Sequence, residues 1–85
     1  MNYEISAFVR GSETVWTGKS FRGMRAEHEE YESLDDAVSM LDRMTPDFLA
    51  DHGFSGPADV RVVIYRHDPD AEAVTIEREK IVTLA

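Results

Sequence analysis

The residues of this chain that could do chemistry are its carboxylates, its histidines and one serine in a glycine-rich setting. Residues 26–36, AEHEEYESLDD, hold six carboxylates in eleven positions. Catalytic pairs of carboxylates are defined by their surroundings, and an abundance of acidic residues therefore identifies no general acid or base. The sequence predicts no catalytic residue in this stretch.

Metal ligands are present but not at the spacing that metal sites use. The three histidines are His28, His52 and His67. None pairs with another at the i, i+4 spacing of a helical zinc site. Asp68, Asp70 and Glu72 alternate like the start of a calcium loop, but the glycine and the distal glutamate of such a loop are missing. The sequence therefore predicts no metal and no cofactor.

Nucleophilic and phosphate-binding motifs are also incomplete. GFSGP at 53–57 places Pro57 where a nucleophile elbow needs glycine, and GKSFRG at 18–23 has the wrong spacing for a phosphate loop. The chain has no cysteine, which removes thiolate catalysis, disulfides and cysteine-based zinc sites. We therefore do not expect an enzyme.

Charge is distributed unevenly along the 85 residues. The net charge is +2 over residues 1–25, −8 over residues 26–51 and −2 over residues 52–85. An acidic total argues against general binding of a phosphate backbone, which needs clustered lysine and arginine. It leaves open a basic partner, or head-to-tail contact between the basic first quarter and the acidic middle. A simpler explanation is that the acidity serves solubility or salt adaptation.

The first third of the chain shows the patterns of strands. Apolar and polar residues alternate over residues 2–10, as in a half-buried strand. GSET at 11–14 reads as a hairpin loop, and a second strand is expected from Val15 to about Phe21. A bend follows at Gly23, and residues 26–31 are expected to form a short strand at the sheet edge.

The clearest helix signal follows. Ser33 is in N-cap position with Asp36 three residues later, and the buried face would comprise Leu34, Ala37, Val38, Leu41 and Met44. Thr45 and Pro46 predict a restart of the helix that ends at Gly53 and turns Phe48 and Leu49 inward. The negative charges of Asp35 and Asp36 suit the N-terminus of this helix. Tyr31 is expected to occupy a core position. Only Glu27, Glu29, Glu30 and Glu32 remain unexplained.

The last third completes an α+β fold in a single domain, residues 1–85. Residues 60–65 are apolar on both faces and predict a central strand, and residues 68–72 predict a turn. Residues 72–84 read as a returning strand, with a helix as the alternative. The expected order is β-β-(β)-α-β-β, an antiparallel sheet of four to five strands with one helix, kinked or restarted at Pro46, on one face.

The other face of this sheet would carry some of the large side chains Phe8, Trp16, Val63 and Tyr65. We therefore expect a homodimer or another homo-oligomer. The sequence favours a small acidic, non-enzymatic interaction or regulatory module that binds a protein partner. Glu27, Glu29, Glu30 and Glu32 would face a basic partner, while Trp16 and Phe21 would anchor the interface.

The alternative is a role related to nucleic acids, although direct binding is disfavoured by the net charge. The chain could be an acidic mimic that inhibits a basic nucleic-acid-binding protein, or it could bind single strands weakly through the basic hairpin with Trp16 and Phe21. The opening MNYEISAFVRG does not resemble a secretory signal, and no apolar run is long enough to span a membrane. We expect a cytoplasmic protein of the prokaryotic or phage accessory kind.

Overall fold

The computed structural model describes residues 1–11, 15–71 and 73–85. Most of the predicted hairpin loop at 11–14, and Glu72 of the predicted turn, lie outside the described residues. The elements are β1 (Asn2–Arg10), β2 (Thr17–Lys19), the short 3₁₀ helix η1 (Ala26–His28), β3 (Glu30–Tyr31), α1 (Leu34–Asp42), α2 (Pro46–Asp51), β4 (Ala58–His67) and β5 (Thr75–Leu84).

All strands belong to one antiparallel sheet in the order β2-β1-β4-β5, with β3 beside β2 on the outer edge of β1. β1 and β4 pair along their whole lengths, from Asn2 opposite His67 to Arg10 opposite Asp59. The predicted α+β class and the central position of β4 are therefore confirmed. β5 is a strand, which decides between the two readings of the C-terminal segment.

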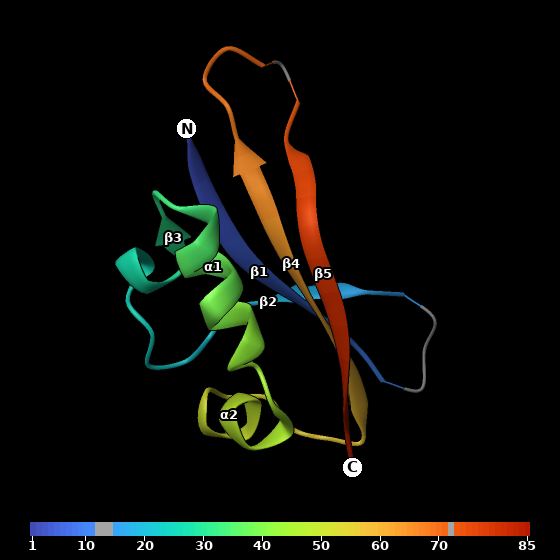
Figure 1. The fold of residues 1–85 in the computed structure, drawn as a ribbon. Helices are drawn as coiled ribbons and strands as arrows, with labels where there is room; N and C mark the ends of the chain where they lie inside the picture. The colour runs from blue at the N-terminus through green and yellow to red at the C-terminus, as the bar shows by residue number, and fades with distance from the viewer. Residues whose placement is uncertain (12–14, 72) are drawn as a thin grey trace.

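Both helices cover the same face of the sheet (Figure 1). Alternate side chains of a strand point to opposite faces, and the residues that face the helices are the apolar set that the sequence pattern predicts. The buried core contains Ile5, Ala7, Val60, Val62, Ile64 and Leu84 from the sheet and Ala37, Leu41 and Leu49 from the helices, with Phe21, Met44 and Phe54 from the connections. The periodic helix face predicted from the sequence thus lies in the core.

The restart at Pro46 is confirmed. α1 ends at Asp42, and α2 begins at Pro46 with Thr45 as its N-cap. The Thr45 hydroxyl accepts a hydrogen bond from the Phe48 backbone N–H at 3.2 Å. Gly53 follows α2 with a φ of +98°, a conformation that suits glycine. None of the helices in the described ranges has the length and apolar character needed to cross a lipid bilayer.

Three local expectations need correction. Ser33 occupies the N-cap of α1, but its side chain makes no capping hydrogen bond. β2 is shorter than predicted, because only residues 17–19 pair with β1, which leaves Trp16 before the strand. Residues 26–28 form the 3₁₀ helix η1, so the predicted edge strand is reduced to Glu30 and Tyr31.

The two helix caps make a matched test of this geometry. Thr45→Ala should lower the free energy of unfolding by about 0.5–2 kcal/mol, because it removes an acceptor from the first turn of α2. Ser33→Ala should cost clearly less, because no capping bond is lost. Urea unfolding of both variants measures the difference. An equal loss from Ser33→Ala would show that its hydroxyl caps α1 in solution.

Candidate interaction surfaces

The sheet face without helices carries an apolar surface, which we call the open face. The register places Phe8, Val63 and Tyr65 on it, since their sequence neighbours point into the helix-side core. β5 adds Ile76 opposite Tyr65 and Ile81 opposite Arg61. Val63 has no exposed surface, whereas Ile76 and Ile81 are 47% and 58% exposed. The prediction that Phe8, Val63 and Tyr65 share the second face is confirmed.

Charged groups on the open face are paired with one another. The Arg61 guanidinium donates to the Glu79 carboxylate at 2.9 Å, and Arg10 donates to Asp59 at 3.0 Å. Thr83 also donates to Asp59, at 2.9 Å. The hydrogen bond from Arg10, and then that from Thr83, lowers the pKa of the Asp59 carboxyl below its ordinary value. Arg10 and Arg61 of the open face are therefore both neutralised by a carboxylate.

Trp16 lies at the margin of the open face. The Arg10 guanidinium lies 4.3 Å from the centre of the indole ring, at cation–π distance. Arg10 thus contacts both the indole ring and the Asp59 carboxylate. Trp16 is partly exposed. Its position leaves the predicted role as an interface anchor open to test.

Phe21 does not lie on this surface. Its side chain is 5% exposed, and its ring centre is 5.3 Å from that of Phe54 in the helix-side core. A side chain packed inside the domain presents almost no area to a partner. The expectation that Phe21 anchors an interface is therefore wrong for this fold.

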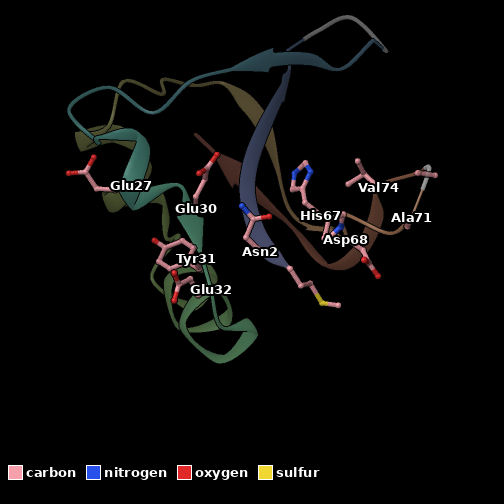
Figure 2. A pocket seen from close by; sticks show the side chains of 12 residues that line it. Asn2, Glu27, Glu30, Tyr31, Glu32, His67, Asp68, Ala71 and Val74 are labelled. Atoms are coloured by element: carbon pink, nitrogen blue, oxygen red, sulfur yellow. The ribbon is translucent and has the colours of Figure 1, made fainter.

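An open groove of about 910 Å³ lies at the end of the sheet that carries the N-terminus. Figure 2 shows Glu27, Glu30 and Glu32 on one side of it and Asp68 on the other, with Asn2 of β1 between them. The first side comes from η1, β3 and the residue that follows β3, and the second from the connection between β4 and β5. We call this the acidic groove. It unites three of the four glutamates that the sequence left unexplained.

Glu29 is the exception, because it is tied to the sheet edge instead. Its backbone carbonyl accepts a hydrogen bond from the Ile5 N–H at 2.8 Å, and it lines a smaller hollow between β2 and β3. Partial burial, followed by the negative charges of Glu4 and Glu30, raises the pKa of its carboxyl. Glu29 is thus a structural residue that carries an unfavourable charge.

Tyr31 packs partly buried against the core, and its hydroxyl donates to the His28 carbonyl. Burial raises the pKa of that hydroxyl, and the carboxylates of Asp36 and Glu29 add to the effect while Arg43 opposes it. The neutral phenol therefore remains a hydrogen-bond donor. This agrees with the predicted core position of Tyr31.

His52 and His67 contact different groups. His52 stacks on Phe48 with ring centres 4.1 Å apart, and its Nδ1 is 2.8 Å from the Phe48 carbonyl. His67 on β4 has Nε2 3.8 Å from the Glu4 carboxylate. Within residues 1–11, 15–71 and 73–85, no three potential ligands group closely enough to hold a metal ion.

The basic residues of the first quarter do not form one surface. Lys19 pairs with Ala7 on the helix side, where its ammonium lies 5.5 Å from the Phe54 ring centre. Arg10 lies on the open face, paired with Asp59. The strand geometry thus separates charges that adjoin one another in the sequence.

No family model, curated protein or solved structure matches this chain. The described residues offer two candidate interaction surfaces, the open face and the acidic groove. The open face carries exposed isoleucines and paired charges, and the acidic groove has carboxylates on both sides.

Glu29 gives a prediction about pH. Its carboxyl pKa is raised in the folded protein above the ordinary value of 4.5, so the folded state holds this proton more tightly than the unfolded chain. The extra stability that the protonated Glu29 gives the folded protein is present below pH 4.5, and it is lost as the pH rises through the raised pKa of the folded state. Glu29→Gln should therefore raise the melting temperature at pH 7, and the gain should shrink as the pH falls below 4.5.

Glu32→Gln is the control, since it removes a charge from an exposed position in the same stretch. Calorimetry from pH 3.5 to pH 8 compares both variants with the parent. A Glu29→Gln variant that is less stable than the parent at pH 7 would contradict the inference that this charge is unfavourable.

Proposed function

We propose that this protein is a small acidic, non-enzymatic interaction module that binds a protein partner through the open face. The observation that carries the proposal is the exposure of Ile76 and Ile81 beside Phe8, Val63 and Tyr65 on a sheet face that no helix covers. We place its action in the cytoplasm, where a small domain without cysteine needs no disulfide.

The physical basis of the proposal is the removal of apolar surface from water. Complete burial of a fully exposed isoleucine side chain is worth about 1.5–3 kcal/mol. Ile76 and Ile81 are 47% and 58% exposed, so covering each of them would contribute about half of that. They lie on β5 opposite Tyr65 and Arg61. Aromatic rings at the centre of an interface add rigid contact area. A protein surface that covers Ile76 and Ile81 would therefore gain affinity without needing a charged contact.

The pairing of charges supports a protein partner over a nucleic acid. Phe8, Trp16 and Tyr65 could stack on bases, but single-strand binding also needs basic groups that are free to meet phosphates. Arg10 and Arg61 are engaged by Asp59 and Glu79. An incoming phosphate would have to displace these carboxylates and would meet a chain of net charge −8.

A photo-crosslinking amino acid at position 81 tests the proposal. The substitution at Ile81 places the probe on the open face, and the same substitution at Ser39 places it on the exposed side of α1. Irradiation of producing cells should yield a protein adduct from position 81 and none, or a different one, from position 39. Adduct masses are read by denaturing electrophoresis and mass spectrometry. The proposal is overturned if position 81 gives no protein adduct or gives the same adducts as position 39.

A second candidate concerns the acidic groove, which could receive a basic protein segment or act as a nucleic-acid mimic. The supporting observation is that three glutamates line one groove with Asp68 across from them. Attraction between opposite charges speeds association and is screened over about 8–10 Å at physiological salt. Capture through this groove should therefore weaken as salt is added.

The test reverses Glu27, Glu30 and Glu32 to lysine together. All three are exposed, so the fold should survive while a basic partner is lost. The matched control reverses Asp42, Asp47 and Asp51, which are exposed on or beside the helices, and changes the net charge equally. Pull-downs from the native cells are compared by mass spectrometry. Equal capture by the parent and both variants would leave the groove as a solubilising surface.

A further inference from the structure

We infer that the partner on the open face is a second copy of this chain, packed face to face about a two-fold axis with both helix layers outward. The inference rests on the proposed function, because it names the partner of that same face. Three observations carry it: where the charge lies, how the open face is composed, and how much area it offers.

The distribution of charge favours this arrangement over the other ways in which two copies could meet. The chain carries −8, and residues 26–51, which hold most of it, contribute η1, β3 and both helices. Among the described residues, the strand register places Arg10, Arg61, Glu4, Asp59 and Glu79 on the open face, a net charge of −1, together with His67. Face-to-face packing brings the nearly neutral surfaces together and keeps the acidic layers far apart, so repulsion between the copies is smallest in this orientation.

The composition of the open face is compatible with two-fold symmetry. At a two-fold interface, residues near the axis meet their own copies, so a lone charge there would face a like charge. The middle of the open face lies at Val63, which has no exposed surface of its own, with Ser6 opposite it on β1. Arg61 and Glu79 are already paired beside it, so each copy presents both signs next to the axis. A second copy thus meets this charge pair at the middle, with the exposed Ile76 and Ile81 on either side of Glu79 along β5.

The area is sufficient for a weak dimer. Three strands of nine or ten residues make up most of the face. At about 4.8 Å between strands and about 3.3 Å per residue, this corresponds to roughly 450 Å² in projection for each copy. Two copies would bury about 900 Å² or more, at the low end for specific interfaces. The expected dimer therefore dissociates on dilution through the micromolar range.

Sedimentation velocity of the purified chain from about 1 to 500 µM tests the inference. The parent should move from the 9.6 kDa monomer toward twice that mass. Ile81→Arg should raise the dissociation constant at least about tenfold, because a charge would be buried without a partner. Ser39→Arg, the same charge on the helix side, should change it little. Ile76→Arg repeats the test at a second exposed position.

Salt provides an independent readout. Screening weakens the repulsion between two acidic copies, so a face-to-face dimer should tighten or stay unchanged as salt rises from 50 to 500 mM. A head-to-tail contact between the basic first quarter and the acidic middle should weaken instead. Dimerisation that weakens with salt and is insensitive to Ile81→Arg would overturn the inference.

The outcomes separate this inference from the proposed function. A monomer at 500 µM, together with an adduct from position 81 to a different protein, would overturn the second copy and leave the interaction module standing. The absence of any adduct from position 81, with a monomer in sedimentation, would overturn both. An adduct of twice 9.6 kDa with loss of the dimer in Ile81→Arg would support both.

Discussion

The structure depends on the burial of β4 on both of its faces. Val62, Val63 and Ile64 have no exposed surface although neighbours on a strand point in opposite directions. α1 and α2 cover the side of Val62 and Ile64, but Val63 must be covered by side chains of the sheet itself. Its neighbours along and across the strands include Arg61 and Tyr65. Both helices lie on the other side of the sheet, so this second face remains open (Figure 1), with Ile76 and Ile81 of β5 exposed on it.

The distribution of charge follows from this single helix layer. Acidic residues accumulate where they do not interfere with β4, on the helices and on the segment that leads into α1. The few charges of the open face are tolerated because each arginine has a carboxylate within hydrogen-bond distance. The protein therefore has an acidic helix side and a nearly neutral open face. Both properties come from the same constraint.

Short-range signals predicted most of the fold. Alternation in β1, the periodic face of α1 and the Thr45–Pro46 restart are decided within a few residues, and all three agree with the structure. What sequence reasoning missed depends on contacts between distant residues. Phe21 looked like a strand-end aromatic, but Phe54 meets it from after α2. The acidic groove exists only because the connection after β4 comes to lie across from β3, and alternation within one segment cannot reveal that.

The free edge of β5 bears on the proposed association, because it is unfavourable for pairing with a second copy. An exposed ten-residue edge strand could pair with another strand, and proteins prevent this with bulges and with charges that point inward. β5 has both features. Its register against β4 shifts between Arg78, which pairs with Ile64, and Ile76, which pairs with Tyr65. Arg78 and Lys80 lie on the helix side of the sheet. Direct antiparallel pairing of two β5 edges about Glu79 would place Arg78 opposite Lys80, a like-charge pair. Packing through the open face would not create this like-charge pair. It would also remove the exposed side chains of Ile76 and Ile81 from water.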